Sequence, residues 1–370
     1  MALQRLNFHI TDRCQLNCDH CLRDPLSKAI DLDLGLIKSI LDQGQSMFAV
    51  RHVGLTGGEP TLHPKFYEII DAIVDRDITW HMVSNGERFD RVLQRLAERP
   101  QRLENLAMFN FSLDGATEET HDSIREKGSF RSVMQAASLC RARGLKFLFQ
   151  ITLNARNVDE IEEIALLASQ LGAVKMAYNF TQPTGTFLDS SLYLPAGEWR
   201  RAVDRIQRAA DAFKIEIFYA DTGPHEEPFQ VCEMWRHASM HVDYRGRLNL
   251  CCQHAGVPSE GAELSDVAGD LNDVSLADAH GRFTEIVNHT VKARLETLQR
   301  DDLGEWDRHF SCNWCLKQFG RPHWVEDGID GPKASRARWR GRWAPGYKDS
   351  HVEADPGLVQ LRVGRTASAE

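Results

Sequence analysis

Six short apolar segments alternate with helix-like segments over the first half of the chain, at residues 5–10, 52–56, 78–84, 106–114, 146–154 and 174–180. Strands that alternate with helices form parallel sheets whose crossover connections are right-handed. The pattern therefore predicts an α/β fold, a full or partial β/α barrel of about six strands. In such folds the chemistry gathers at the C-terminal ends of the strands.

The regular alternation ends after one more helix-like segment at 195–214. Beyond it the sequence has five of the nine cysteines, a hairpin-like segment at 241–251 and a long helix-like segment. We expect a barrel domain at 1–214, a smaller cysteine-bearing domain at 215–328 and a loosely ordered tail at 329–370. The tail is basic and carries two tryptophans, which favours packing on the domain surface over docking of nucleic acid or a partner.

The composition excludes several classes of function. The net charge of −9 argues against a general nucleic-acid binder and favours neutral or cationic substrates. The sequence has neither an apolar run of the ~20 residues that a membrane helix needs nor a signal-peptide pattern at its start. We therefore expect a cytoplasmic protein without membrane or nucleic-acid partners, whose nine cysteines serve metal or redox chemistry rather than disulfides.

Three cysteines, Cys14, Cys18 and Cys21, lie close together directly after the first expected strand, in the segment TDRCQLNCDHCLRD. Zinc normally needs a fourth protein ligand, here His20 or a distant cysteine. A [4Fe–4S] cluster with three cysteine ligands instead keeps one iron open for another ligand. Both alternatives follow from the spacing alone.

A second motif, LTGGEP at residues 55–60, ends the second expected strand, so its backbone is expected near the cysteine loop. Gly57 and Gly58 lack a Cβ, which lets a ligand approach the main chain closely. The Glu59 carboxylate can hold an ammonium group. This motif beside this cysteine spacing favours the cluster over zinc.

Together the two motifs resemble the radical S-adenosylmethionine (SAM) superfamily over roughly residues 5–181. The resemblance implies an enzyme built on a partial (β/α)6 barrel. It implies that Cys14, Cys18 and Cys21 bind three irons of a [4Fe–4S] cluster whose fourth iron binds SAM. An electron from an external donor of the flavodoxin or ferredoxin type then yields a 5′-deoxyadenosyl radical, and the protein supplies orientation.

The resemblance also implies SAM contacts at the strand ends. The GGEP segment binds the methionine ammonium, polar side chains contact methionine or ribose, and His20 faces adenine. These residues are His20, Gly57, Gly58, Glu59, Pro60, Ser84, Ser112, Asp114 and Asn154. The alternative for the polar residues is strand-end capping or a turn.

A second set of cysteines comprises Cys232, Cys251, Cys312 and Cys315. A hairpin turn at Gly246 brings the first two together, and the CNWC segment supplies two more thiolates for zinc or an iron–sulfur cluster. Beside the barrel, this spacing resembles the SPASM and Twitch auxiliary-cluster domains. The chain has no cysteine after residue 315, so the one-cluster Twitch version, suited to electron transfer, is the one implied.

Two cysteines remain. Cys140 lies on an apolar helix-like face and is expected to be a small buried residue. Cys252 stands where sulfatase-maturing relatives have an aspartate that takes a proton from substrate. Three roles are open for it: a catalytic hydrogen-atom donor, as in radical epimerases of the superfamily; a buried bystander or alternate ligand; or another role.

The function that follows is SAM-dependent hydrogen abstraction from an unactivated carbon. We expect a ribosomally made peptide as substrate, with oxidation, crosslinking or epimerisation as the outcome. The alternative is an aminoglycoside or carbohydrate dehydrogenase or epimerase that uses Cys252. Since the chain starts directly at the first strand, we expect no fused peptide-recognition domain before it. This expectation weakens the peptide hypothesis, but a separate recognition protein could supply the function. A zinc- or cluster-binding scaffold or redox sensor is the competing non-enzymatic class.

Overall fold

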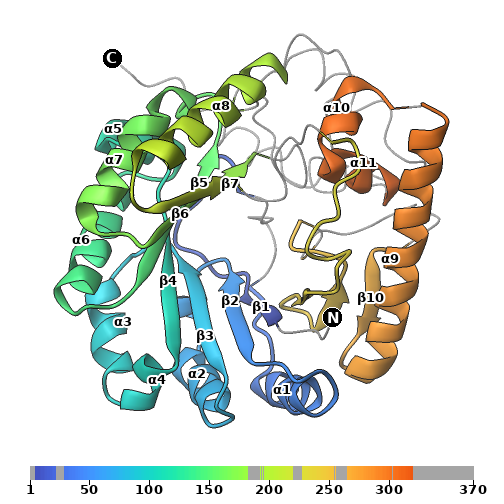
Figure 1. The fold of residues 1–370 in the computed structure, drawn as a ribbon. Coiled ribbons are helices and arrows are strands. Elements are labelled where there is room, and N and C mark those ends of the chain that lie inside the picture. The colour runs from blue at the N-terminus through green and yellow to red at the C-terminus, as the bar shows by residue number, and fades with distance from the viewer. Residues whose placement is uncertain are drawn as a thin grey trace, which may run out of the picture.

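The computed structural model describes residues 5–21, 29–181, 192, 194, 196–219, 227–253, 255, 265–301 and 303–319 (Figure 1). The expected tail at 329–370 lies outside the described residues. No helix in the described ranges is long and apolar enough to cross a membrane.

The six expected strands are present and pair in parallel in chain order. They are β1 (Arg5–Thr11), β2 (His52–Gly57), β3 (Thr79–Ser84), β4 (Leu106–Ser112), β5 (Phe147–Leu153) and β6 (Lys175–Phe180). A further strand, β7 (Glu216–Tyr219), pairs in parallel with β6. The barrel sheet therefore continues past residue 214, where the sequence pattern had placed a domain boundary.

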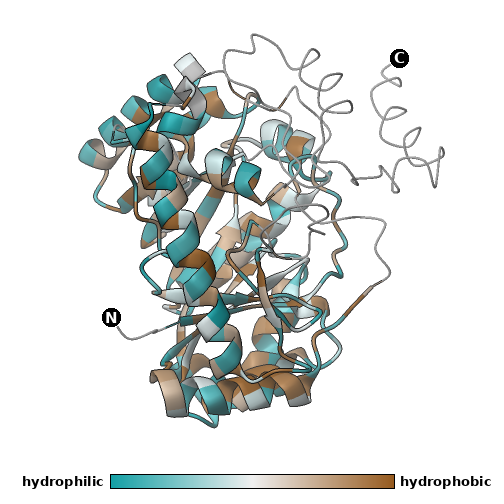
Figure 2. Cartoon of the chain, turned by 90° about the vertical axis from the view of Figure 1, so that its right-hand side faces the viewer, coloured by the Kyte–Doolittle hydropathy of each residue, from teal (hydrophilic) through white to brown (hydrophobic). Residues whose placement is uncertain are grey.

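Helices cover the outer face of this sheet (Figure 1). They are α1 (Leu34–Phe48), α2 (Phe66–Val74), α3 (Phe89–Leu96), α4 (Pro100–Glu104), α5 (Glu118–Ile124), α6 (Ser129–Ala142), α7 (Ile161–Leu171) and α8 (Ala196–Ala212), with 3-10 turns η1 (Pro60–Leu62) and η2 (Val158–Glu160). The helices that face the viewer in Figure 2 carry both hydrophilic and hydrophobic residues, as amphipathic helices do.

Alternation along the strands explains which side chains face the site. In β1, Leu6, Phe8 and Ile10 are fully buried in the hydrophobic core. The intervening Arg5 and Asn7 line a cavity on the other face of the sheet. Since successive strand residues point to opposite faces, one short strand contributes to both.

The cysteine-bearing second half is joined to the barrel through the sheet itself. It comprises β8 (Ser239–Val242), β9 (Arg247–Asn249), β10 (Val267–Asp270), α9 (Leu276–Gln299), α10 (Glu305–His309) and α11 (Ser311–Gln318). The β8–β9 hairpin is present, with Gly246 at φ +87° in its turn. β8 pairs in parallel with β1, giving one ten-stranded sheet in the order β10-β9-β8-β1-β2-β3-β4-β5-β6-β7.

Candidate functional site

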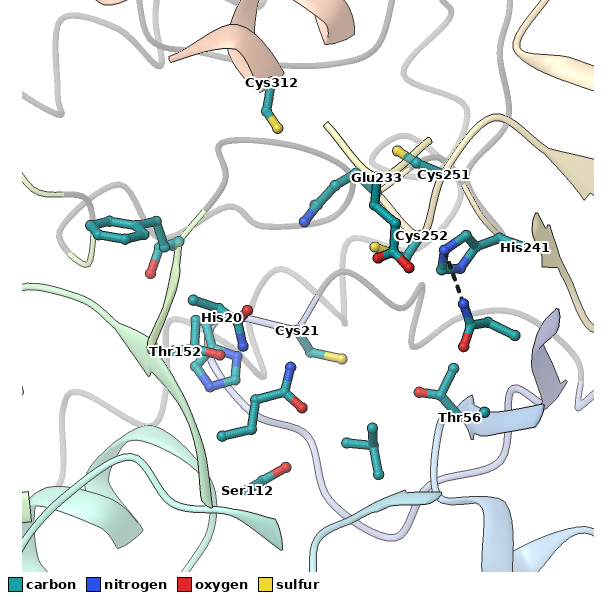
Figure 3. Close-up of a pocket in the computed structure, with 18 of the residues that line it drawn as sticks. His20, Cys21, Thr56, Ser112, Thr152, Glu233, His241, Cys251, Cys252 and Cys312 are labelled. Atoms are coloured by element: carbon teal, nitrogen blue, oxygen red, sulfur yellow. Dashed lines mark hydrogen bonds between the residues drawn. The ribbon is translucent and has the colours of Figure 1, made fainter. Parts of the chain in front are cut away.

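A cavity of about 690 Å³ lies at the C-terminal ends of the barrel strands, between the barrel and the second half of the chain (Figure 3). Its size is typical of small-molecule sites. Both sets of cysteines line it, together with the extra thiol at 252: Cys14, Cys18, Cys21, Cys232, Cys251, Cys252, Cys312 and Cys315. Cys140 is fully buried in α6, as expected, and does not line the cavity.

The GGE segment is fastened to the backbone of the cysteine loop. The Gly58 amide donates to the Thr11 carbonyl at 2.7 Å, and the Glu59 amide donates to the Arg13 carbonyl at 2.6 Å. A Cβ at Gly57 would lie 2.2 Å from the Thr11 oxygen, and one at Gly58 would lie 2.1 Å from the Arg13 oxygen. Gly57 also has φ +139°. The close approach that these glycines permit is thus to the chain that leads into the cysteine loop.

Polar donors face two sulfur atoms of the first cysteine set. Asn85 Nδ2 lies 3.9 Å from Cys14 Sγ, and Arg125 Nη1 lies 3.9 Å from Cys18 Sγ. Burial raises the pKa of the Cys18 thiol to about 12, while the Arg125 charge opposes this shift. Because a cation and an amide donor stabilise thiolates, these surroundings fit an iron–sulfur cluster, whose ligands must be deprotonated.

Behind this loop Asp114 is a buried hub with no exposed surface. Its carboxylate is bonded to His20 Nε2 at 2.7 Å, Arg125 Nε at 2.5 Å and the Thr152 amide at 2.7 Å. Although burial acts to raise it, Arg125 and His20 hold the pKa of Asp114 well below its ordinary value. Asp114 therefore orients two side chains that do reach the cavity.

Glu59 is a second buried carboxylate, only 1% exposed. It accepts from Thr61 Oγ1 at 2.8 Å, from the Asn85 amide at 2.9 Å and from Ser84 Oγ at 3.1 Å. Burial raises the pKa of Glu59, and these hydrogen bonds partly offset the shift. The carboxylate thus fixes the ends of β2 and β3 relative to each other.

The residues predicted to contact SAM divide into two groups. His20, Gly58, Ser84 and Ser112 line the cavity, whereas Gly57, Glu59, Pro60, Asp114 and Asn154 do not. Asn154 is engaged in its own turn, where Nδ2 donates to the Thr152 carbonyl and Oδ1 accepts from the Arg156 amide, both at 2.9 Å.

Several cavity residues were missed by sequence reasoning: Asn85, Arg125, Gln150, Thr152, Asn179 and Glu233. Gln150 and Thr152 are the polar positions of an alternating strand, so the period-2 pattern of β5 contained a signal for them. Arg125 had no such signal, because only tertiary folding brings it to Cys18.

The second set of cysteines comes from three separate segments. Cys232 precedes β8, Cys251 follows β9, and Cys312 and Cys315 lie three residues apart in α11, on one helix face. No three His, Cys, Asp or Glu side chains in the described part of the chain converge on a single ion. Four thiols from three segments that line one cavity form a donor set suited to an iron–sulfur cluster and also to zinc.

Cys252 is exposed to the cavity, which Glu233 and His241 also line, and its side chain lies near the Glu233 carboxylate (Figure 3). Protein surrounds its other sides, and this burial, together with the Glu233 carboxylate, raises the pKa of the thiol to about 11. Glu233 is itself paired with Arg5 at 3.2 Å. The Cys252 side chain therefore lines the cavity, where a bound molecule can reach its thiol.

The geometry defines a β/α-barrel protein in which one cavity is lined both by a three-cysteine strand-end loop and by a four-cysteine set. Residues 8–168 match the family model of the radical SAM superfamily. Over this segment, which is a little under half of its length, the chain is similar to the radical SAM superfamily.

Individual relatives extend the comparison. The chain is 34% identical over 175 residues to mycofactocin maturase MftC of Mycobacterium tuberculosis, which covers 45% of this chain and 42% of that protein. It is 26% identical over 280 residues to PqqA peptide cyclase of Gluconobacter oxydans, covering 73% and 74%. The chain spans about half the length of the curated relatives that it matches first.

The fold is shared over nearly the whole chain with a solved structure of anSMEcpe with bound AdoMet and Kp18Cys peptide. The TM-score is 0.61 at 14% identity, covering 98% of this chain and 99% of the other. The chain therefore has the same fold as that structure.

Proposed function

We propose that this chain is a radical SAM enzyme in which Cys14, Cys18 and Cys21 hold a [4Fe–4S] cluster that binds SAM. The chemistry that this pair supplies is reductive cleavage of SAM to a 5′-deoxyadenosyl radical, which takes a hydrogen atom from an unactivated carbon. The observation that carries the proposal is the convergence of both cysteine sets on one cavity.

The residues around the first cluster have distinct tasks in this proposal. His20, Gly58, Ser84 and Ser112 line the cavity and contact SAM directly. Gly57, Glu59, Pro60, Asp114 and Asn154 shape the strand ends that carry those contacts. Polar side chains held by buried carboxylates keep their orientation, which is what a radical source needs to avoid side reactions.

In the proposal Cys232, Cys251, Cys312 and Cys315 hold an auxiliary [4Fe–4S] cluster within an auxiliary domain. The sequence predicts that domain at 215–328, after a barrel domain at 1–214, and we place its start after β7, which belongs to the barrel sheet. With four protein thiolates the auxiliary cluster has no open iron, which suits electron transfer. We assign the electron supply for SAM cleavage to a flavodoxin- or ferredoxin-type protein, and the location of the enzyme to the cytoplasm.

The proposed substrate is a ribosomally made peptide. MftC is named a maturase and PqqA cyclase a peptide cyclase, and the anSMEcpe structure holds a peptide. The cavity supports this assignment, because neutral amides such as Gln150 and Asn179 line it beside the aromatic ring of Phe218. Amides of this kind can pair with peptide groups.

A second candidate function rests on Cys252, whose thiol faces the cavity. In an epimerase of aminoglycosides or other carbohydrates, this S–H bond would give a hydrogen atom to the opposite face of the substrate radical. The resulting thiyl radical would regain an electron from the external flavodoxin- or ferredoxin-type donor and a proton from solvent. In a dehydrogenase, the substrate radical would instead lose an electron to the auxiliary cluster and a proton to solvent. The donor role of Cys252 would also serve epimerisation of a peptide.

Cys252→Ala separates epimerisation, which uses the thiol as hydrogen-atom donor, from oxidation or crosslinking, which does not. In D₂O, an epimerising enzyme puts deuterium on the inverted carbon, and the alanine variant stops at the substrate radical without inverted product. If the variant still forms inverted product, Cys252 is not the donor.

The cluster assignment is tested by anaerobic reconstitution and iron analysis. Two [4Fe–4S] clusters require about eight irons per chain. Cys14→Ala/Cys18→Ala/Cys21→Ala and Cys312→Ala/Cys315→Ala should each retain about half, and Cys140→Ala, the buried control, should retain all. Zinc in place of iron at either site would contradict the proposal.

A further inference from the structure

Arg294 in α9 is a fully buried cation, with 0% of its surface exposed. Its Nη2 donates to the Pro228 carbonyl at 2.7 Å and to the Arg308 carbonyl at 3.2 Å. Its Nε and Nη1 have no hydrogen-bond partner among the described residues. A buried charge with two unsatisfied donors is costly unless an anionic group compensates it.

The guanidinium lies where the segments carrying the auxiliary cysteines meet. Pro228 lies four residues before Cys232, in the same described segment. The Arg294 Cζ atom is 5.3 Å from the ring centroid of Trp314, the residue directly before Cys315 in α11. The Arg294 side chain thus contacts both the segment before Cys232 and α11, the helix that carries Cys312 and Cys315.

Two anionic groups act on this charge, the Asp307 carboxylate in α10 and the sulfur of Cys315. Asp307 accepts a hydrogen bond from Lys317 Nζ at 2.7 Å and makes none with Arg294 Nε or Nη1, so these two donors stay open. Burial lowers the pKa of Arg294, as expected of a cation held away from water. Thiolates bound to iron are anions that accept N–H hydrogen bonds, and they would satisfy both the charge and the open donors.

We propose that Arg294 is a positioning and tuning residue for the auxiliary cluster: its open N–H groups and its charge stabilise the thiolates held by α11. The inference rests on the proposed function, because it requires a cluster at Cys232, Cys251, Cys312 and Cys315. A cluster that takes up one electron gains one negative charge. A buried cation beside it favours that reduced state and raises its reduction potential.

The test uses the full chain with the first cluster removed by Cys14→Ala/Cys18→Ala/Cys21→Ala, so that the auxiliary cluster alone gives a signal. In this background Arg294→Met, which keeps much of the packing volume, is compared with Arg294→Lys, which keeps the charge. Lys292→Met is the matched control, since it removes a cation from the same helix where the side chain is 78% exposed. The readout is an electron-paramagnetic-resonance redox titration.

In Arg294→Met the equilibrium constant for one-electron reduction of the auxiliary cluster should fall at least tenfold. For a one-electron couple, a tenfold fall lowers the midpoint potential by about 59 mV. Arg294→Lys should recover part of the shift, and Lys292→Met should leave the midpoint unchanged. An unchanged midpoint in Arg294→Met, with a lower melting temperature, overturns the inference and leaves Arg294 a purely structural side chain.

Two further outcomes keep the inference separate from the proposed function. If Arg294→Met does not fold, Arg294→Gln is compared with Arg294→Lys. Both of these side chains donate hydrogen bonds and only lysine is charged, so equal midpoint potentials overturn the inference. If the background chain binds no iron, the proposed auxiliary cluster is wrong, and the inference falls with it.

Discussion

At the scale of single residues, buried charges around the first cysteine loop are satisfied by one another rather than by water. Arg125, His20 and the Thr152 amide all meet the Asp114 carboxylate. Removing one partner from such a group leaves another buried charge uncompensated, which is far more costly than losing an exposed ion pair.

Asp114→Asn should therefore lower the free energy of unfolding by about 3 kcal/mol or more and reduce iron retention at the first site. The matched control is Asp19→Asn, which breaks the Asp19–Arg156 pair of 2.7 Å, where the side chains are 43% and 34% exposed. That change should cost less than about 1 kcal/mol. Urea unfolding measures both changes in the free energy of unfolding. Equal decreases in the two variants would contradict the view that Asp114 compensates buried charges.

A histidine pair, His52 at the start of β2 and the cavity-lining His81 in β3, predicts a pH dependence of stability. His81 Nδ1 and His52 Nε2 are 2.6 Å apart, and the rings stack at 4.9 Å between centroids. Burial, and then His52, lower the pKa of His81 to about 3. Below pH ~6.5 the unfolded chain takes up a proton here that the folded chain refuses, so acidification destabilises the fold.

One such group lowers the free energy of unfolding by about 2 kcal/mol between pH 7.5 and pH 5. His81→Gln should remove that part of the decline, measured by urea unfolding at both pH values. A variant that declines as steeply as the wild type would show that His81 titrates normally in the folded chain.

At the scale of elements, the contact between the end of β2 and the cysteine loop is the most constrained one near the site. A methyl group at Gly58 has nowhere to go, since it meets a backbone oxygen at 2.1 Å. Gly58→Ala should therefore cost about 2 kcal/mol or more of stability and reduce iron incorporation at the first cluster.

Gly281 provides the matched control, because a Cβ there meets nothing within 4 Å and the residue lies inside α9. Gly281→Ala should raise stability by about 0.5–1 kcal/mol through its better helix propensity. Thermal unfolding compares the two. If Gly58→Ala were as well tolerated, the loop contact would not be rigid.

The elements themselves were largely predictable. Six strands and the 241–251 hairpin follow from local alternation, and the structure confirms them. The pairing of β8 with β1 was not predictable, because the partner of a four-residue strand is chosen by tertiary packing. Nor was β7, whose four residues lay past the end of the regular pattern.

The candidate site, like the fold, was predictable from the sequence only in part. Cysteine spacing is local, so both sets were visible in the sequence, and the structure brings both to one cavity. The partners of Asp114 are not local: His20 is 94 positions away and Thr152 is 38. A strand-end aspartate therefore predicted a SAM contact, whereas its full burial gives it a supporting place behind the cavity.

At the scale of the whole molecule, one continuous sheet connects the two cysteine sets. β8 lies against β1, the strand that leads into the first cysteine loop, and the turn after β9 carries Cys251. The separation of the two sets is thereby fixed by strand pairing rather than by a linker. In the proposed function, a substrate in the cavity would lie between the first cluster and the auxiliary cluster.

The most direct test of this account is SAM cleavage by the reconstituted, reduced enzyme without oxygen. The account predicts 5′-deoxyadenosine and methionine in equal amounts from the wild type, none above background from Cys14→Ala/Cys18→Ala/Cys21→Ala, and continued release from Cys312→Ala/Cys315→Ala. Wild-type enzyme with full iron that releases no 5′-deoxyadenosine, or a triple variant that releases as much, would contradict it.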